Sequence, residues 1–485
     1  MNAVRLLVLT LILTFLPAAA APAAGLDPGD CAWPAKADPD RVNVAFPDES
    51  AHYWITPFTV APGTSMTITG RFPDARYLSF HLYEGSMPLD ALADDELEPD
   101  AGGNPFRLAA ARGDRGTYTV RVVAGKRPAD APANTLYAES LNGEPNVSGV
   151  IIYRLYLPEG DEYGGAGLPR VTYGDAAGGD ATTAPLPSCQ NPAPVKSGTV
   201  NDAVREVSVP AAPRESDAPP WGISKSRPET KSAGPVTYRT GGAFFPNFHN
   251  VYLSLLTRRD QGEVVAFRAK APTYVQTRDA ALMPRAQLRY FSICVNDFPT
   301  TRYVACLPDE RIAVDADGFF TVVISDREHK PAKLGPSDNW LPSGPYADTF
   351  VLYRQMLPSA DFLEAVDAAP SADEAPRTMG AYYPDTRICT AARFDADRCG
   401  LAVAQPRPAT EPARTSIGEP VRPAAARKKA KPARRGRPSA RRCRRARSVA
   451  QHARTRAARR LAGRTVRRCR AGRRGSRRAA RRGRS

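Results

Sequence analysis

Histidine is scarce in this chain of 485 residues, which contains only five. Candidates for a general base are therefore few. The sequence has no H-E-x-x-H, no G-x-S-x-G, no Walker loop and no G-x-G-x-x-G after a strand. Its acidic residues include no pair that stands out for glycosidase chemistry. These absences argue against the common hydrolase, NTPase and dinucleotide-binding classes. We expect a protein that is not an enzyme and has no catalytic, cofactor-binding or metal site.

Long hydrophobic runs are also lacking, except for one near the N-terminus. A mainly apolar run from Leu6 to Ala20 follows Arg5 and leads into the small residues 21–23. A single positive charge, a short apolar run and an A-x-A site are typical of a secretory signal peptide, and the run is short for a membrane anchor. We predict that residues 1–23 direct export and that the protein is extracellular or attached to the cell surface. The absence of a second run excludes a polytopic membrane protein.

Acidic residues are absent from the C-terminal end of the chain. Residues 421–485 contain 28 Arg or Lys, which leaves 39 basic against 50 acidic residues in residues 1–420. The formal charge is therefore −11 for the body and +28 for the C-terminal end. This separation excludes a uniformly basic nucleic-acid-binding domain.

Residues 406–485, called the tail below, are rich in Arg, Ala and Pro and are predicted to be disordered. Because a guanidinium can donate two hydrogen bonds to one phosphate, we expect the tail to bind anionic cell-surface polymers or lipid head groups, and to bind no nucleic acid sequence-specifically. The alternatives are a reading frame that runs past the true end of the gene and a tail that lies on the acidic body. The candidate polyanion-binding residues are Arg434, Arg435, Arg441, Arg442, Arg444, Arg445, Arg467, Arg468, Arg481 and Arg482.

Six of the eight cysteines lie in the body, and exported proteins form disulfides. Cys31 and Cys189 bracket the first half of the body, and the other four form two local pairs. Zinc is the alternative, but the chain has no C-x-x-C and few histidines. The role of Cys443 and Cys469 in the tail stays open. We expect three bridges: Cys31–Cys189, Cys294–Cys306 and Cys389–Cys399.

The body contains an internal repeat with an offset of about 200 residues. Three segments recur in the same order, and Tyr53, Gly63 and Pro73 match residues 199 positions later. The chain therefore contains two copies of one domain. The recurring segments are Arg76–Ser79 with Arg289–Ser292, Gly116–Val120 with Gly318–Val322, and Tyr153–Pro158 with Tyr353–Pro358.

Each copy is predicted to be built of β-strands. In residues 76–83 the apolar side chains at 78, 80 and 82 alternate with those at 77, 79, 81 and 83, and residues 290–296 show the same alternation. Short strands between turns, in units of this size, favour an all-β fold with two tandem β-sandwich, jelly-roll-like domains. Arg154 and Arg354 occupy equivalent positions inside apolar strands. We interpret them as structural arginines that reach an acid on a neighbouring strand or loop, or lie on an exposed edge.

A family resemblance supports this fold. It rests on Arg289–Ser292, Val314–Gly318, Asn339–Pro342 and Arg354–Pro358. This pattern resembles the C-terminal member of a tandem pair of bacterial domains of unknown function. The stretch from about Cys31 to Cys399 also resembles uncharacterised secreted actinobacterial proteins with the same two copies. The resemblance implies a β-sandwich-like fold and no assigned activity. In the first copy, Asn134–Tyr137 replaces the Asn339–Pro342 block.

Proline-rich composition marks the connection between the copies. The predicted organisation is a signal peptide at 1–23, a first domain at 24–190, a linker at 191–235, a second domain at 236–405, and the tail at 406–485.

Three local features carry weaker predictions. His81 shares its strand face with Tyr77, Ser79 and Tyr83, a face that could contact a ligand, and we expect it to be solvated or hydrogen-bonded rather than catalytic. The acidic run at 90–100 lacks the calcium-loop pattern and is expected to be a solvated loop. Residues Asp315, Ala316, Asp317 and Gly318 are expected to form a turn.

These observations lead to a secreted, non-enzymatic surface or wall-associated protein as the favoured function. A secreted carbohydrate-binding module or glycan-active enzyme, with a glycan on a sheet face, is the alternative, and it rests on fold analogy. An extracellular nucleic-acid binder that acts through the tail is the third hypothesis.

Overall fold

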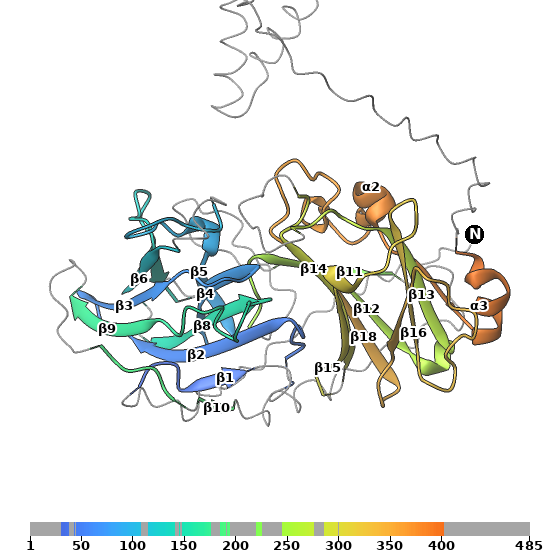
Figure 1. The fold of residues 1–485 in the computed structure, drawn as a ribbon, viewed down its shortest axis with the longest axis horizontal. Coiled ribbons are helices and arrows are strands. Elements are labelled where there is room, and N and C mark those ends of the chain that lie inside the picture. Colours follow the sequence, from blue (N-terminus) through green and yellow to red (C-terminus); the bar gives the residue numbers. More distant parts are fainter. Residues whose placement is uncertain are drawn as a thin grey trace, which may run out of the picture. The chain divides into compact units, whose positions relative to one another are not determined.

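The computed structural model describes residues 31–401, with gaps at 38–42, 44, 108–114, 141–144, 146–147, 176–184, 191, 195–219, 226–244, 276–285 and 299. These residues belong to one compact unit that is mainly β (Figure 1). It contains two β-sandwich domains, each made of two packed sheets, as the sequence predicts. The signal peptide and the tail lie outside the described residues.

The first domain packs a sheet of order β10-β1-β2-β8-β4-β5 against a sheet of order β7-β6-β3-β9. All its pairs are antiparallel except β1–β10 and β6–β7. Its elements are β1 (Ala35–Ala37), β2 (Ala51–Thr59), β3 (Thr64–Arg71), β4 (Tyr77–Glu84), β5 (Met87–Ala93), the 3-10 helix η1 (Asp94–Glu96), β6 (Thr117–Ala124), β7 (Thr135–Ala138), β8 (Ser148–Tyr156), β9 (Arg170–Asp175) and β10 (Ala193–Pro194).

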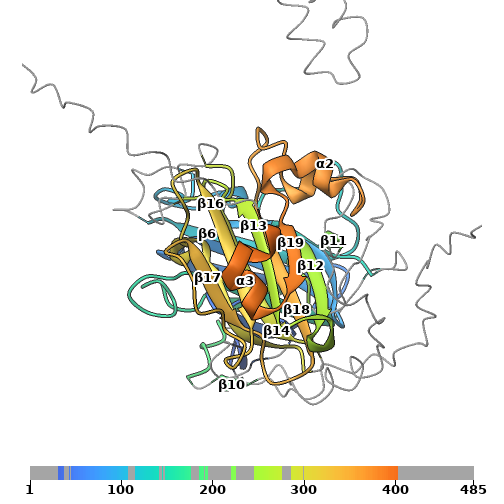
Figure 2. The same ribbon diagram turned by 90° about the vertical axis from the view of Figure 1, so that its right-hand side faces the viewer.

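The second domain repeats this topology with β11-β12-β18-β14-β15 against β17-β16-β13-β19. Each strand therefore corresponds to the strand numbered ten lower, which confirms the internal repeat. Figure 2 shows strands β13, β16 and β17 of the second domain. Its elements are β11 (Gly222–Lys225), β12 (Asn250–Arg258), η3 (Arg259–Gln261), β13 (Val264–Lys270), β14 (Tyr290–Asp297), β15 (Arg302–Pro308), η5 (Asp309–Arg311), β16 (Phe319–Ser325), β17 (Asp338–Pro342), β18 (Asp348–Met356), η6 (Val366–Ala368), α2 (Ala375–Met379), η7 (Gly380–Tyr382), β19 (Asp385–Cys389), α3 (Ala391–Asp397) and η8 (Arg398–Gly400).

Each core lies between the two sheets of its domain and contains the side chains that the alternation predicts. Leu78, Phe80 and Leu82 are buried in the first core, together with Trp54. Phe291, Ile293 and Val295 occupy the matching places in the second core. Period-two alternation identifies these residues because successive side chains of a strand point to opposite faces of the sheet.

Two short parts of the predicted linker of residues 191–235 form strands. β10 pairs with β1, and β11 pairs with β12. Trp221, which directly precedes β11, is 1% exposed in the second core, and its Nε1 donates to Thr386. Nearly all of the rest of the predicted linker lies outside the described residues. Proline-rich composition did not reveal that short pieces of that segment complete a sheet edge.

The three expected disulfides are present, namely Cys31–Cys189, Cys294–Cys306 and Cys389–Cys399. The first ties the two ends of the first domain, and the second joins directly opposed residues of β14 and β15. The third links the end of β19 to η8. Among the described residues, no helix has the length and apolar character needed to cross a bilayer.

Candidate functional site

The polar side chains that the sequence analysis singled out gather where the two domains meet. Two five-residue segments, one before each domain's first long strand, build this interface. Residues 46–50, Phe-Pro-Asp-Glu-Ser, are called the first arm and contact the outer face of β14 and β18. Residues 245–249, Phe-Pro-Asn-Phe-His, are called the second arm and contact the outer face of β4 and β8.

The contacts across the interface are reciprocal, as in an approximate twofold arrangement. Arg76 Nη1 donates to the carbonyl of Arg289, and Arg289 Nη1 donates to the carbonyl of Arg76, both at 3.4 Å. These two arginines open the Arg-Tyr-x-Ser repeat. An interface of this kind presents the same patch twice, so one repeated sequence can supply both of its halves.

Each of these arginines also forms a buried ion pair with the other domain. Arg289 Nη1 lies 2.8 Å from Asp94 Oδ1 of η1, and Arg76 Nη1 lies 3.2 Å from Asp309 Oδ2 of η5. All four side chains are at most 1% exposed. Arg76 also pairs with Glu310, which is partly exposed.

The two aspartates connect the domains because each also binds its own sheet. Asp94 Oδ2 accepts from the backbone N–H of Leu78 at 2.9 Å, and Asp309 Oδ2 accepts from that of Phe291 at 3.2 Å. Burial raises the pKa of both carboxyls to about 7, although the facing guanidinium groups act in the opposite direction. The expectation of a solvated acidic loop is therefore wrong for Asp94. A loop residue was buried by the second domain, which local composition does not reveal.

Arg154 and Arg354 have a structural role, but their partners differ from the expected ones. They lie on β8 and β18, are 2% and 3% exposed, and both reach across the interface. Arg354 donates to the carbonyl of Phe46, and its Nη1 lies 3.8 Å from the Asp48 carboxylate. Arg154 donates to the carbonyl of Phe245 at 2.8 Å. The acid or carbonyl comes from the arm of the other domain, and neither arginine lies on an exposed edge.

His81 is fully buried and hydrogen-bonded, the second of the two environments expected for it, and the second arm contacts the sheet face that was considered for a ligand. Its Nε2 accepts from the backbone N–H of Phe248 at 3.1 Å, and its ring lies 5.0 Å from that of His249. Burial lowers the pKa of His81 well below 6.5, and Arg154 lowers it further. His81 is therefore neutral and hydrogen-bonded. A glycan on a sheet face would need a face other than this one.

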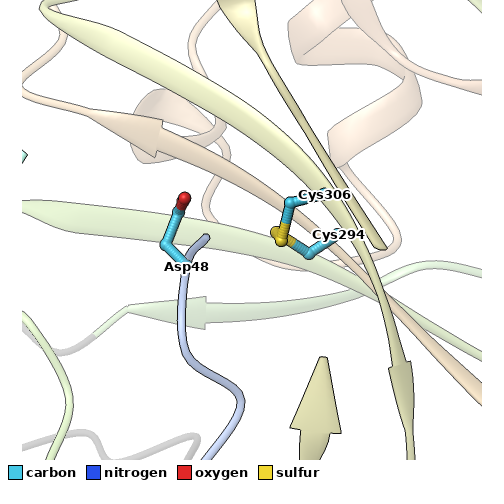
Figure 3. Close-up of side chains that lie close together, drawn as sticks. All are labelled: Asp48, Cys294 and Cys306. Atoms are coloured by element: carbon cyan, nitrogen blue, oxygen red, sulfur yellow. A yellow bond between two sulfur atoms is a disulfide. The ribbon is translucent and has the colours of Figure 1, made fainter. Parts of the chain in front are cut away.

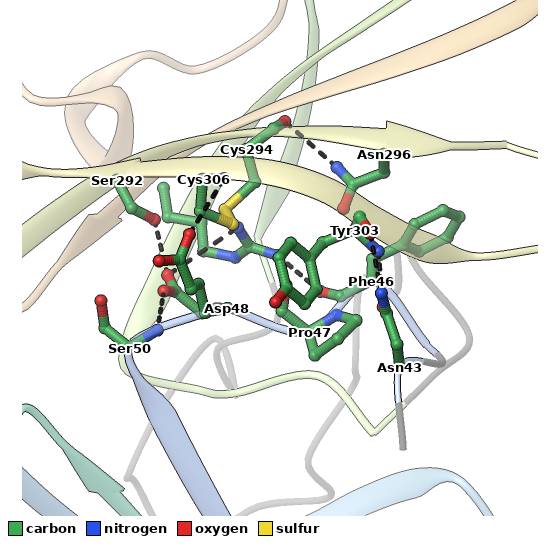
Figure 4. The surroundings of a disulfide bond; sticks show 12 residues. Asn43, Phe46, Pro47, Asp48, Ser50, Ser292, Cys294, Asn296, Tyr303 and Cys306 are labelled. Carbon is green, nitrogen blue, oxygen red and sulfur yellow. Dashed lines mark hydrogen bonds and ion pairs between the residues drawn. A yellow bond between two sulfur atoms is a disulfide. The ribbon is translucent and has the colours of Figure 1, made fainter. Parts of the chain in front are cut away.

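The counterpart of His81 in the second domain is Cys294, whose disulfide to Cys306 lies beside Asp48 (Figure 3). The two sulfurs and a carboxylate oxygen lie within 4.8 Å of one another. Both sulfurs are oxidised in the bridge and offer no thiolate to a metal ion. Asp48 instead accepts from Ser292 Oγ at 2.6 Å and from the backbone N–H of Ser50 at 3.0 Å (Figure 4).

The first arm continues toward β15. Asn43 and Tyr303 exchange two hydrogen bonds of 2.7 Å between the Asn43 side chain and the Tyr303 backbone. The backbone N–H of Phe46 donates to the carbonyl of Thr301 at 2.7 Å. The Phe46 ring packs against Phe350 at 4.9 Å. These contacts fix the arm along the edge of the second domain.

Apolar side chains from both domains fill the centre of the interface. They form one buried cluster in which the rings of Tyr156 and Tyr290 meet edge to face at 5.3 Å. The other buried members are Ala51, Tyr77, Ala93 and Met356.

Sequence reasoning missed the two arms, although a signal was present. Phe46-Pro47 and Phe245-Pro246 share the offset of 199 found for the tyrosine, glycine and proline matches. Both phenylalanines adopt a positive φ, 52° and 47°, which is unusual for a bulky residue and requires support from the surroundings. The repeat shows that the arms are equivalent, but only the structure shows that each arm contacts the opposite domain.

The remaining predictions have mixed outcomes. Residues 315–318 form the expected turn, in which Gly318 has φ +80° and donates to the carbonyl of Asp315 at 3.0 Å. The Asn134 side chain exchanges hydrogen bonds with the backbone of Glu98, and the Asn339 side chain does the same with the backbone of Ala313. The first copy therefore retains the asparagine contact of the Asn339–Pro342 block. The ten tail arginines lie outside the described residues.

Comparisons with known proteins add little. The sequence matches no protein-family model and no curated protein. Among solved structures, it is similar to an uncharacterised protein from Burkholderia cenocepacia, with 14% identity, a TM-score of 0.41, and coverage of 74% of this chain and 82% of the other. It is also similar to a protein from Vibrio parahaemolyticus, with 12% identity, a TM-score of 0.36, and coverage of 71% and 90%.

Proposed function

We propose that this chain is an exported, non-enzymatic protein that is held at the cell surface by its tail and displays the two-domain β body. The observation that carries the proposal is the separation of charge. The last 65 residues contain 28 cations and no acid, whereas residues 1–420 carry a formal charge of −11.

The body supports this proposal in two ways. Three disulfides suit a protein that functions in an oxidising compartment. The polar groups on the outer faces of β4, β8, β14 and β18 make contacts between the domains. Their role is therefore structural. The relationship to secreted actinobacterial proteins with the same two copies is part of this proposal.

Phosphate-rich polymers fit the chemistry of the tail. Arginine forks bind phosphate oxygens in pairs, and each cation near an anionic lipid surface contributes about 1 kcal/mol. Binding of this kind releases counterions, so its affinity falls steeply with salt. For a protein with 6–10 phosphate contacts on DNA, the loss is about 10³–10⁵-fold between about 50 and 200 mM salt.

The test uses the full-length protein and two tail variants. The first replaces the ten candidate arginines by glutamine, and the second replaces the same ten by lysine, which keeps the charge. Binding is measured to beads coated with phosphate-rich wall polymer and to vesicles with and without anionic lipid, at about 50 and 200 mM salt. The wild type and the lysine variant are expected to bind and to release with salt, whereas the glutamine variant binds much more weakly. Equal binding of all three proteins, or binding that is unchanged by salt, would contradict the tether.

A further inference from the structure

The two arms bring different titratable groups to the sheet faces that they cover. Asp48 of the first arm lies 3.8 Å from Arg354 Nη1, so a carboxylate faces that guanidinium. The offset of 199 places Asn247 of the second arm at the position of Asp48. Neither the first arm nor β14 or β18 contains a histidine. The half of the interface that the second arm forms contains two, His81 on β4 and His249 on the arm itself.

His81 can hold the second arm only while its ring is neutral. The residue is 0% exposed, and its Nε2 accepts from the backbone N–H of Phe248 at 3.1 Å. The proton of the neutral ring therefore resides on Nδ1. A second proton would go to Nε2 and would place one N–H donor against another. Protonation of His81 and its hydrogen bond to the arm therefore exclude each other.

The surroundings of His81 also oppose a positive charge on its ring. Burial has the largest effect and lowers its pKa, and Arg154 on β8 and His249 lower it further. The side-chain hydrogen bond with Asn247 acts in the opposite direction but does not outweigh them. The rings of His81 and His249 are only 5.0 Å apart. A proton on His81 would therefore be a buried charge beside another cationic group.

The other titratable groups of this half do not neutralise such a charge. Tyr77 Oη lies 2.6 Å from His249 Nδ1, and the Tyr83 ring lies 6.1 Å from that of His81. Burial raises the pKa of Tyr77 and raises that of Tyr83 to about 12, so both hydroxyls stay neutral. The carboxylate of Glu96 on η1 is partly exposed and lies 3.9 Å from His249 Nε2, so it faces that ring. β5 places an alanine opposite His81.

We propose that the second arm detaches from the first domain in mild acid: proton uptake by His81 releases residues 245–249 from the outer face of β4 and β8, while the first arm stays bound to β14 and β18. While the arm is bound, the ring stays neutral. Once the arm has left, the ring is in water and takes up a proton at the ordinary pKa of about 6.5. Because only the open form binds this proton, each pH unit below about 6.5 favours the open form by about tenfold.

The first arm has no equivalent response. The counterpart of His81 is Cys294, which is held in the disulfide to Cys306 and does not titrate. The buried aspartates do not distinguish the arms, because burial raises the pKa of both Asp94 and Asp309 to about 7 and their ion pairs with arginine are reciprocal. A difference between the two arms therefore isolates the contribution of the histidine.

Hydrogen exchange of the full-length protein, followed by mass spectrometry, tests the proposal. Exposure times are scaled to the intrinsic exchange rate at each pH, and peptides covering 245–250 and 46–51 report on the two arms. Between about pH 7.5 and 6.5 the ratio of their protection factors is expected to stay nearly constant. Between about pH 6.5 and 5.5 the protection of the second arm is expected to fall by up to about tenfold relative to that of the first.

Substitutions identify the group that takes up the proton. His81→Gln and His81→Asn keep a side-chain acceptor but cannot be protonated, and both are expected to abolish the relative fall. The matched control is His329→Gln, which removes a histidine that is 38% exposed and is expected to leave the fall unchanged. Peptides from β3 and β6, in the opposite sheet, show that each variant is folded. The proposal is overturned if the two arms of the wild type respond alike, if the fall persists in a folded His81 variant, or if His329→Gln abolishes it.

Discussion

Loss of one interface arginine is expected to destabilise both domains, and to do so more at high pH than at low pH. At 2.8 Å, the attraction between Arg289 and Asp94 is about 6 kcal/mol at an effective dielectric constant of about 20. Desolvation of both groups opposes it. Removal of one partner from a buried pair costs about 3–5 kcal/mol, because the remaining carboxyl must either stay buried as a charge or take up a proton. We expect this cost for Arg289→Met at pH 8, and a similar cost for Arg76→Met because the pairs are reciprocal.

The dependence on pH follows from the pKa of Asp94. The carboxyl has a pKa of about 7 in the folded protein, and removal of the guanidinium raises it further. Between pH 7 and pH 8 the wild type then releases a proton that the variant retains. The variant alone loses stability in this range, by about 1.4 kcal/mol per pH unit. Below pH 7 both proteins carry the proton, so the cost of Arg289→Met is smaller at pH 5.5 than at pH 8.

The assay is urea unfolding at pH 8 and at pH 5.5, followed by tryptophan fluorescence. Trp33 and Trp54 report on the first core and Trp221 on the second. The control is Arg377→Met, which breaks an ion pair whose arginine is 80% exposed and should cost less than about 1 kcal/mol. The reasoning is refuted if Arg289→Met costs no more than the control at pH 8, or costs more at pH 5.5 than at pH 8.

Three further predictions follow from burial and connectivity. The folded protein keeps His81 neutral, whereas His81 in the unfolded chain takes up a proton below pH 6.5. The unfolding free energy of the wild type should therefore fall by about 1.4 kcal/mol per pH unit, relative to that of His81→Asn, as the pH falls from 6.5. A difference in unfolding free energy that stays constant with pH in urea titrations would contradict this. Replacement of Cys31 and Cys189 by alanine opens a bridge with a sequence separation of 158 and should cost up to about 5 kcal/mol of unfolding free energy, whereas an unchanged midpoint would argue against the chain-entropy account. Limited proteolysis should cut within the proline-rich linker of residues 191–235, and the two fragments should still co-elute from a sizing column because the interface joins them; separate elution would show that the interface is weak.

The sequence by itself determined the fold class and the repeat. Strand alternation identified Leu78, Phe80 and Leu82 as core residues because side-chain direction in a strand depends only on local geometry. The cysteines paired as their spacing suggested. The equivalence of Arg154 and Arg354 was also visible, because a duplicated domain keeps its side chains in register.

The tertiary structure alone decided what the outer sheet faces do. A strand pattern says that His81 points away from its own core, but not that residues 245–249 cover it 164 or more positions later in the chain. Asp94 was expected to lie in a solvated loop for the same reason, and no local pattern marked Asp309. Their partners lie in the other domain, at sequence separations of more than 200 for Arg76–Asp309 and nearly as many for Asp94–Arg289. Contacts between domains depend on how the surfaces of two folded domains pack together. The residues that form these surfaces are far apart in the sequence, so no local pattern shows which of them will be in contact.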